Sequence, residues 1–583
     1  MTNYLNNINS PADLKKLSVE QLPDLAEEIR QALLSRLMAT GGHAGPNLGM
    51  VEATIALHYV FDSPADKFVF DVSHQCYVHK ILTGRKDGFT DPERYGAYSG
   101  YTNPSESEHD MFTVGHTATA LSLATGLAAA RDLKGESGNV VAIVGDGSMS
   151  GGEAFEGLNN ASMLGSNFIL LFNDNEIAIS PNYGGMYQNF AALRETNGTA
   201  ECNFFKSFGM DYCYVSDGND VQAMVEALQK VKDTDHPVVV HIHTEKGKGL
   251  SWNRENLEGS HFVMPGGSSL DDVMGSFESC GSVMAEHLLE KIKKDPTVIV
   301  ISPATPGQSF LTPDFRRKAG MQFIDVGIAE EHAVAFASGL AKNGAKPVLC
   351  IVSSFLQRTF DQLLLDLSLD RSPATILVGN ATINPGDATH CGIYDIAMQS
   401  SIPNLIGLAP TTKEEYLAMF DWALEQTNAP VVIREPSAVV SAGREVTFTD
   451  ADLGCYEVAE RGAKVAFIGL GNFFHLAGQA RSALKEKTRI EATVINPRIY
   501  STLDEKTLES LKAEHEIVVT LEDGVLAGGF GQRIASFYGP SSIKVLNYGA
   551  AKEFRDRMPV EAQYQRDHLT PELIIQDIEA ILN

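Results

Sequence analysis

The sequence predicts an α/β protein made of three consecutive, doubly wound domains. Short apolar runs alternate with amphipathic helical stretches along nearly the whole chain, a pattern typical of parallel sheets covered by helices on both faces. The chain has 583 residues. Because this exceeds what one hydrophobic core normally holds, we expect about three domains of roughly 150–200 residues each.

The first domain is predicted from four apolar runs. KFVFDVS, VVAIVGD, NFILLFND and HPVVVHIHT are expected to be buried strands. Helical stretches such as TALSLATGLAAARDL separate them, so the strands should lie parallel to one another. The pattern weakens at VMPGGSSLDDVMGS, where Gly, Ser and Asp cluster. We therefore expect a first domain over residues 1–271.

Two further domains follow from the same alternation. The runs TVIVISP, FIDVGIA, PVLCIVS, ATILVGN and APVVIREP predict a second sheet, and the pattern breaks again at SAGREVTFTDADLG. The runs KVAFIGLG, EATVINP, IVVTLED and IKVLNYG predict a third sheet. The expected bounds are 272–441 for the second domain and 442–583 for the third.

Composition limits the classes of partner. The net charge of −28 argues against nucleic acid or an anionic membrane as a partner, although local amides or a cation can still bind a small anion. The seven cysteines form no CxxC pair, which indicates a reducing compartment. The start of the chain lacks the basic and apolar regions of a signal peptide, and no apolar run approaches ~18 residues. We therefore expect a cytoplasmic protein.

Two polar turns follow neighbouring strands in the first domain. Gly145-Asp146-Gly147 follows VVAIV, and Asn173-Asp174-Asn175 follows NFILLF about 30 residues later, the length of a βαβ unit. A helix over roughly residues 151–164 should direct its free amides to the same sheet edge. Open parallel sheets bind ligands at the carboxyl ends of their strands, and glycines there let a phosphate approach closely.

These turns predict a magnesium site. A carboxylate, an amide oxygen and a backbone carbonyl are the hard ligands that Mg²⁺ prefers, with phosphate oxygens completing the octahedron. We expect Asp146, Asn175 and the carbonyl of Ile177 to hold Mg²⁺ against a diphosphate. The alternative interpretation is a pair of ordinary loop turns.

The run GDG…AFEGLNNA…NDNEIAIS resembles the 1-deoxy-D-xylulose-5-phosphate synthase family, which are transketolase relatives that use thiamine diphosphate. The resemblance covers nearly the whole chain and includes the blocks GGHAGPNLGMVEATIALHYVF, DVSHQCYVHKILTGR, SESEHDMFTVGHTAT, DVGIAEEHAVAFASGLA and SSFLQRTFDQLLLD. It implies a homodimeric transferase of isoprenoid and thiamine biosynthesis with thiamine diphosphate and Mg²⁺ as cofactors. The implied reaction decarboxylates pyruvate and joins the two-carbon unit to an aldehyde, D-glyceraldehyde 3-phosphate in the family.

The resemblance also implies which residues bind the cofactor. Glu330 matches the glutamate that hydrogen-bonds N1′ of the aminopyrimidine, and Phe355 matches the residue that stacks on this ring. Arg358 is expected at the pyrimidine rim or on a helix face. Since Glu330 and Asp146 belong to different predicted domains, the cofactor is expected to bridge them. The remaining positions implied to contact the cofactor are His74, His116, Gly145, Gly147, Ser148 and Asn175.

A set of histidines completes the implied site. Imidazoles can donate, accept and transfer protons near neutral pH, and family active-site histidines match five positions here. Asp387 matches a carboxylate that contacts the acceptor hydroxyl. The residues implied to be catalytic are Glu330, Asp387, His43, His74, His261 and His390, and His116 is implied to lie nearby. His79 and Lys80 are weaker candidates.

The chain departs from the family where the acceptor phosphate is normally held. Asn380, Ser437 and Pro104 stand where basic residues are expected, although Arg434 is kept, and Val352 replaces a tyrosine. A charge-assisted hydrogen bond contributes roughly 1.5–3 kcal/mol, so losing two could weaken phosphate binding by about 10²–10⁴-fold. The segment between Ser180 and Phe204 is also shorter than in most of the family.

Several alternatives remain open. Arg358, Arg254 or Lys248 could replace the missing cations; otherwise the chain is a related transketolase or acyloin synthase with a different, possibly non-phosphorylated acceptor. FIGLGNFFHLAG weakly resembles a dinucleotide fingerprint, but its glycine spacing does not fit GxGxxG. A non-catalytic relative that binds the cofactor for regulation is the third alternative, and the presence of Glu330 argues against it.

Overall fold

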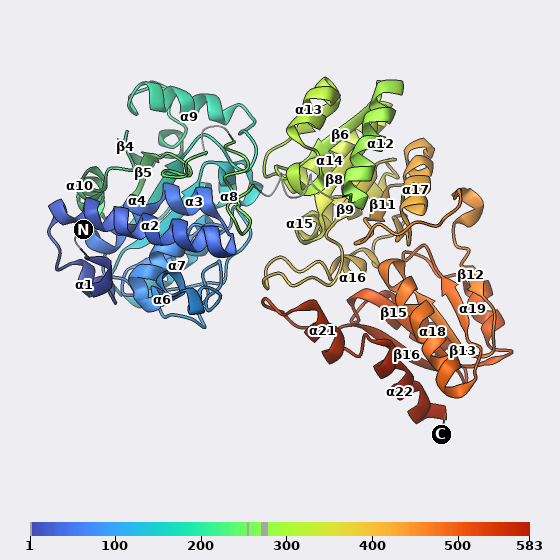
Figure 1. Cartoon of the computed structure of the whole chain (residues 1–583). Helices are drawn as coiled ribbons and strands as arrows, with labels where there is room; N and C mark the ends of the chain where they lie inside the picture. Colours follow the sequence, from blue (N-terminus) through green and yellow to red (C-terminus); the bar gives the residue numbers. More distant parts are fainter. Residues whose placement is uncertain (1–2, 253–255, 270–277, 583) are drawn as a thin grey trace. The chain divides into compact units, whose positions relative to one another are not determined.

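The computed structural model describes residues 3–252, 256–269 and 278–582. It forms two compact units, which are seen in Figure 1. The first contains Met1–Ser276 with Gly327–Ala329, and the second contains Phe277–Val326 with Glu330–Asn583. Three sheets are present, one in the first unit and two in the second, which confirms the predicted α/β class. The predicted boundary at 271/272 lies outside the described residues.

The sheet of the first unit is parallel throughout, with the order β1-β2-β3-β5-β4. Four of its strands coincide with the predicted apolar runs. The sequence analysis missed β4, an edge strand whose half-exposed residues DYCYV form no apolar run. The strands are β1 (Lys67–Phe70), β2 (Val140–Gly145), β3 (Phe168–Asp174), β4 (Asp211–Val215) and β5 (Pro237–His243).

Helices cover both faces of this sheet because its central strands carry buried apolar residues on both sides. Val141 and Ile143 of β2 pack with helices α2, α4 and α10, whereas Ala142 and Val144 pack with α7 and α8 on the other face. The main helices are α2 (Leu22–Thr40), α3 (Ala44–Gly49), α4 (Val51–Val60), α5 (Tyr77–Lys80), α7 (Ala120–Lys134), α8 (Gly152–Ala161), α9 (Met186–Glu195) and α10 (Val221–Val231).

The second sheet, with the order β10-β11-β9-β8-β6-β7, is also parallel. Its strands are β6 (Val298–Ser302), β7 (Phe323–Asp325), β8 (Lys346–Val352), β9 (Thr375–Gly379), β10 (Ile406–Leu408) and β11 (Val431–Arg434). The main helices are α12 (Cys280–Lys294), α13 (Pro313–Ala319), α14 (Glu330–Lys342), α15 (Ser353–Leu356), α16 (Asp395–Gln399) and α17 (Lys413–Glu425).

The third sheet has the order β12-β14-β13-β15-β16, with β12 as an antiparallel edge strand. Its strands are β12 (Glu457–Glu460), β13 (Lys464–Gly469), β14 (Thr493–Asn496), β15 (His515–Val525) and β16 (Lys544–Ala550). The main helices are α18 (Phe474–Thr488), α19 (Glu505–Leu511), α20 (Phe530–Tyr538), α21 (Val560–Arg566) and α22 (Pro571–Leu582).

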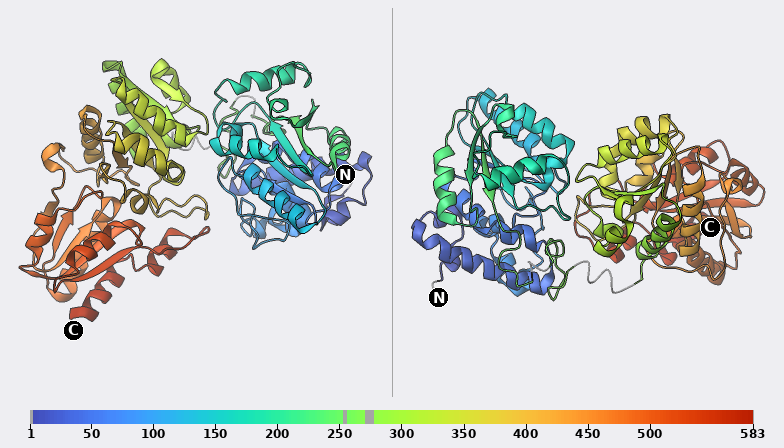
Figure 2. Two further views of the ribbon diagram at one scale, coloured as in Figure 1. Left: turned by 180° about the vertical axis from the view of Figure 1, so that it is seen from behind. Right: turned by 90° about the horizontal axis from the view of Figure 1, so that it is seen from above.

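The second and third sheets share one hydrophobic core. Leu408 and Ile433 of the second sheet belong to the same buried cluster as Ile468 and Ile495 of the third, and Figure 2 shows the two sheets within one unit. The division at 441/442 therefore stays a prediction. Among the described residues, no helix is long and apolar enough to span a bilayer.

Candidate active site

The tips of β2 and β3 lie side by side, as the βαβ spacing predicts. Gly145 pairs with Asn173 in the parallel register, and the amide of Asp146 donates to the carbonyl oxygen of Asn173 at 3.0 Å. The Asp146 carboxylate is buried. Its Oδ1 accepts from the Gly147 amide at 2.9 Å, and its Oδ2 accepts from Asn182 Nδ2 at 2.8 Å.

Gly147 is required at this edge by a close approach between two loops. A Cβ built on Gly147 would lie 2.6 Å from Cβ of Ala178, closer than two carbons can pack. The buried Ser148 follows in a short 3-10 turn, Gly147–Ser150, that leads into α8. Helix α8 therefore begins six residues after Asp146, and the free amides of a helix N-terminus favour an anion.

The chain reverses direction directly after β3. Glu176 adopts a left-handed backbone conformation with φ 70°, and Ile177 forms an isolated antiparallel bridge with Pro181. The Ile177 amide lies 3.4 Å from Asn175 Oδ1. The reversal therefore keeps Asn175 and the Ile177 backbone within one short turn next to Asp146.

Asp174, the other carboxylate in this turn, is already neutralised. Its Oδ2 accepts from Arg194 Nη1 at 2.6 Å and from His241 Nε2 at 3.0 Å, and the side chain is 1% exposed. Arg194 comes from α9. Asp146 is consequently the carboxylate of this turn that remains for a cation.

The residues present fit a divalent cation. Burial raises the pKa of Asp146 to about 7, and the nearby negative charge of Asp174 adds to the rise. Asn182 Oδ1 is buried without a hydrogen-bond partner in the described structure. A carboxylate that burial makes costly to ionise, next to an orphaned amide oxygen, is what a bound cation would stabilise.

A histidine cluster lies in the first unit. The ring centroids of His43 and His74 are 5.1 Å apart, those of His43 and His261 5.6 Å, and those of His74 and His261 5.2 Å. The buried Asn47 of α3 aligns two of their loops, because its Nδ2 donates to the carbonyls of both His43 and His74 at 2.7 Å. Burial lowers the pKa of His261 well below its usual value, so this imidazole is neutral.

His116 lies in the segment that precedes α7. The amides of Ala118 and Ala120 donate to the buried Asp71 carboxylate, at 2.9 and 3.0 Å. A Cβ built on Gly151 would lie 2.6 Å from Cβ of Ala118. The loop that carries His116 therefore packs against the start of α8, beside the Asp146 turn.

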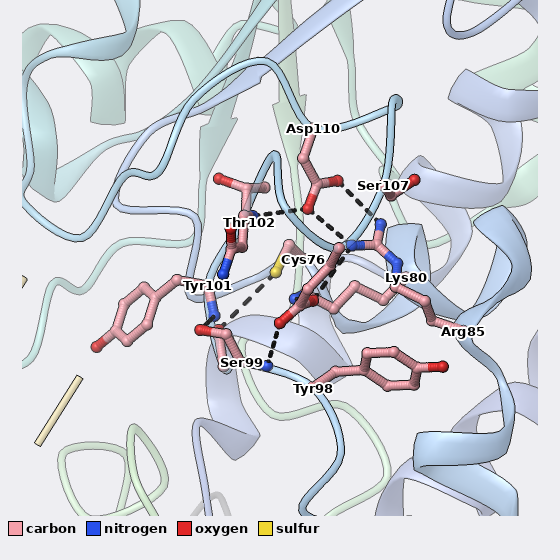
Figure 3. Close-up of polar contacts among 12 residues, drawn as sticks. Cys76, Lys80, Arg85, Tyr98, Ser99, Tyr101, Thr102, Ser107 and Asp110 are labelled. Atoms are coloured by element: carbon pink, nitrogen blue, oxygen red, sulfur yellow. Dashed lines mark hydrogen bonds and ion pairs between the residues drawn. The ribbon is translucent and has the colours of Figure 1, made fainter. Parts of the chain in front are cut away.

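His79 and Lys80, the weaker candidates, belong to a buried ionic network instead. Lys80 Nζ lies 2.5 Å from Glu106, and the network continues through Arg85 to Asp110, which accepts from His79 Nε2 at 2.8 Å. Figure 3 shows how this network connects helix α5 to the following loop. Both residues have positions that suit a structural role.

Glu330 is the first residue of α14 in the second unit, and it is 3% exposed. Burial raises the pKa of its carboxyl group, an effect that the Arg358 charge only partly opposes. Arg358 Nη1 lies 3.6 Å from Oε2, beyond hydrogen-bond reach, and Oε2 has no hydrogen-bond partner among the described residues. An aminopyrimidine nitrogen that donates or shares a proton would satisfy this orphaned buried oxygen.

Phe355, His390 and Asp387 also lie together in the second unit. The rings of Phe355 and His390 meet edge to face with centroids 5.7 Å apart, and Asp387 Oδ1 lies 3.3 Å from His390 Nδ1. Burial alone would raise the pKa of Asp387, but the hydrogen bond with His390 and the charge of its ring outweigh burial and hold this pKa below its usual value. Arg358 follows Phe355 by one turn, so Glu330 and this group share one region.

Each candidate phosphate cation among the described residues already has an acidic partner. Arg434 is 2% exposed and pairs with Asp395 and Asp523, so it is a structural residue. Lys248 pairs with Glu52 at 3.2 Å, and Arg358 faces Glu330. Arg254 lies outside the described residues.

The positions where the sequence departs from the family carry uncharged residues. Asn380 has a left-handed φ of 54°, the Ser437 amide donates to Asn472 at 2.9 Å, and Val352 is buried. Pro104 is exposed.

Sequence reasoning missed several polar residues near the Asp146 turn. Asn182 and Arg194 contact Asp146 and Asp174, and Lys246 is buried with its Nζ donating to the Ala178 carbonyl. Burial lowers the pKa of Lys246 to about 8, which Asp146 partly opposes. Only Lys246 carried a signal, because it follows the predicted strand HPVVVHIHT.

Comparisons with known proteins match the chain along its length. The family described as 1-deoxy-D-xylulose-5-phosphate synthase matches residues 5–202 and 196–244. The transketolase pyrimidine-binding domain matches 279–441, and the transketolase C-terminal domain matches 454–571. The 1-deoxy-D-xylulose-5-phosphate synthase of Symbiobacterium thermophilum is 37% identical over 626 aligned residues, covering 99% of this chain and 95% of that protein.

The chain belongs to the 1-deoxy-D-xylulose-5-phosphate synthase family. The synthase of Carboxydothermus hydrogenoformans is 36% identical, with 99% of each chain covered. A crystal structure of Pichia stipitis transketolase is 16% identical with a TM-score of 0.44, covering 95% of this chain and 96% of that one. Membership of this synthase family makes the protein an enzyme of the transketolase-like transferase type and confirms the predicted resemblance.

Proposed function

We propose that this family member decarboxylates pyruvate and joins the resulting two-carbon unit to an aldehyde, using thiamine diphosphate and Mg²⁺. The observation that carries the proposal is the buried Asp146 at the tip of β2, beside the Asn175 turn, in a chain whose relatives along its full length are named synthases. When bound, the thiazolium ring of the cofactor supplies an electron sink at the reacting carbon.

The residues of the first unit would hold the diphosphate and its cation. Asp146, Asn175 and the Ile177 carbonyl would coordinate Mg²⁺, and the Ser148 amide in the 3-10 turn would contact a phosphate oxygen. The Gly147 amide holds the Asp146 carboxylate in place. Arg194 and His241 keep the Asp174 charge occupied, so that Asp146 directs its own charge to the cation.

Two residues of the second unit would orient the aminopyrimidine. Glu330 Oε2, buried and without a hydrogen-bond partner among the described residues, would share a proton with the ring nitrogen N1′, and Phe355 would stack against the ring. Since burial favours the protonated form of Glu330, this carboxyl group can donate its proton to a base in a site from which water is excluded.

The histidines would contact the substrates. His43, His74 and His261 form a cluster of rings that can donate and accept hydrogen bonds. Because burial lowers the pKa of His261 well below its usual value, this imidazole would act as a neutral hydrogen-bonding group rather than as a base. His390, held by Asp387 at 3.3 Å, can deliver a proton to the oxygen of an aldehyde acceptor as the new C–C bond forms. We also propose a cytoplasmic homodimer, which the reduced cysteines and the family support.

A second candidate acceptor is an aldehyde without phosphate. The buried ion pairs of Arg434 and the neutral residues Asn380 and Ser437 favour it, because each removes a cation from the expected clamp. Comparing kcat/KM for D-glyceraldehyde and its 3-phosphate decides between the two. A preference above about 100-fold for the phosphorylated aldehyde would reject the second candidate.

Two variants test the cofactor assignment. Asp146→Ala should abolish magnesium-dependent binding of thiamine diphosphate, measured by calorimetry. Glu330→Gln should keep that binding and lose hydrogen–deuterium exchange at thiazolium C2. The proposal fails if the native protein releases no carbon dioxide from pyruvate, or if Asp146→Ala binds the cofactor as the native protein does.

A further inference from the structure

The loop between Tyr95 and Thr119 has neither helix nor strand, yet much of it is fixed. Its first half is held by two carboxylates, those of the half-buried Glu106 and the buried Asp110. Glu106 Oε1 accepts from the Ser99 amide at 2.7 Å, and Asp110 Oδ2 accepts from the Asn103 amide at 2.7 Å. Between these anchors, the Thr102 amide donates to Ser73 Oγ at 2.9 Å.

The two carboxylates are themselves fixed by cations of the preceding element. Lys80, which is fully buried, pairs with Glu106, and Arg85 donates to both oxygens of Asp110 at 2.7 and 2.9 Å. A buried carboxylate with charged partners and amide donors is costly to displace. Residues 99–103 therefore have a defined backbone position although they belong to no regular element.

Tyr101 lies in the middle of this fixed stretch and reaches the histidine cluster. Its side chain is 9% exposed, and its ring centroid lies 5.7 Å from that of His43 at an interplanar angle of 71°. Figure 3 shows the Tyr101 ring pointing away from the ionic network, whereas the Tyr98 ring points in another direction. The network thus places one phenol beside the imidazole of His43, which in turn contacts His74 and His261.

We propose that Tyr101 is a substrate-contacting residue that recognises a hydroxyl group of the aldehyde acceptor. A phenol and a neutral imidazole each donate and accept a hydrogen bond. A hydroxyl group, which also does both, matches them, whereas a carboxylate or phosphate is matched by Arg or Lys. Lys80, Glu106, Arg85 and Asp110 are then positioning residues for Tyr101. This inference rests on the proposed function.

The test uses two acceptors that differ in one hydroxyl group. With pyruvate as donor, we would measure kcat/KM for D-glyceraldehyde 3-phosphate and for 3-phosphooxypropanal, which lacks the C2 hydroxyl. Tyr101→Phe removes only the phenol oxygen and keeps the ring contact with His43. It should lower kcat/KM about 3–10-fold for the hydroxylated aldehyde, the size of one neutral hydrogen bond, and leave the other aldehyde within about twofold.

Tyr98→Phe is the matched control, because Tyr98 lies in the same loop but its hydroxyl donates to Asp87 at 3.1 Å. It should leave the ratio of the two kcat/KM values unchanged. Equal losses for both aldehydes in Tyr101→Phe, or no loss for either, would overturn the assignment. If the native enzyme makes no product from pyruvate with either of these aldehydes or with D-glyceraldehyde, the proposed function fails instead.

Discussion

Arg434→Met should destabilise the second unit by about 3–5 kcal/mol. Arg434 is 2% exposed; its Nε lies 2.8 Å from Asp395, its Nη1 pairs with Asp523, and its Nη2 donates to the Ala381 carbonyl at 2.6 Å. Methionine fills the apolar stem but leaves two buried carboxylates facing each other. Breaking a buried pair from one side costs about 3–5 kcal/mol. Two buried carboxylates lose their cation in this variant, although Asp523 keeps its hydrogen bond from Asn472.

The loss should depend on pH in a defined direction. Burial already raises the pKa of Asp395 with Arg434 in place, and removing the arginine raises it further. A carboxyl group whose folded pKa exceeds its unfolded value binds a proton on folding, so stability falls as pH rises between those values. The variant should therefore lose more free energy of unfolding at pH 8 than at pH 5.

Urea unfolding followed by tryptophan fluorescence measures this loss in one unit. The chain has two tryptophans, and in a Trp252→Phe background Trp422 of α17 reports on the second unit alone. With a slope of about 3 kcal/mol per M, the midpoint should fall by about 1–1.7 M urea. Arg317→Met is the control, because its pair with Asp314 is exposed and should contribute less than about 1 kcal/mol. An unchanged midpoint, with a raised KM for a phosphorylated aldehyde, would refute the structural role and make Arg434 a phosphate ligand.

Three further outcomes are expected. Gly147→Ala should weaken magnesium-dependent binding of thiamine diphosphate at least 10-fold by calorimetry, since its Cβ would meet that of Ala178 at 2.6 Å; unchanged affinity would contradict the crowding. Burial raises the pKa of Glu435 to about 7, so the native free energy of unfolding should fall as pH rises from 4.5 to 7. In urea unfolding, Glu435→Gln should be more stable than the native chain by about 1–3 kcal/mol at pH 8 and equally stable at pH 4.5. Asn47→Leu should lower the free energy of unfolding by about 1–3 kcal/mol, because the His43 and His74 carbonyls lose their hydrogen bonds from the Asn47 amide. The variant should also lower kcat more than cofactor affinity. A kcat equal to that of the native enzyme would show that the histidine cluster does not depend on this amide.

Most of the strands and the position of the Asp146 turn could be predicted from the sequence. Buried parallel strands are apolar at every position, so runs such as VVAIV and NFILLF stand out, and the length of a βαβ unit places their ends together. The missed strands β4, β10 and β12 are short or lie at sheet edges. Their residues are half-exposed or too few to form an apolar run.

The partners of the site could not be read from the sequence. Asn182, Arg194 and His241 lie far from Asp146 or Asp174 along the chain, and each is an ordinary polar residue until folding brings it to the turn. The position of Tyr101 could not be predicted either, because it depends on a loop without regular secondary structure. The assignments of Glu330 and the histidines came from the family resemblance, and their catalytic roles stay predictions.

The core shared by the second and third sheets has a practical consequence for anyone dissecting the enzyme. Removing everything after residue 441 would uncover Leu408 and Ile433 and would take away Asp523, half of the anionic environment of Arg434. The C-terminal sheet therefore completes the hydrophobic core of the unit that contains Glu330. A truncated protein without this sheet is expected to aggregate during expression.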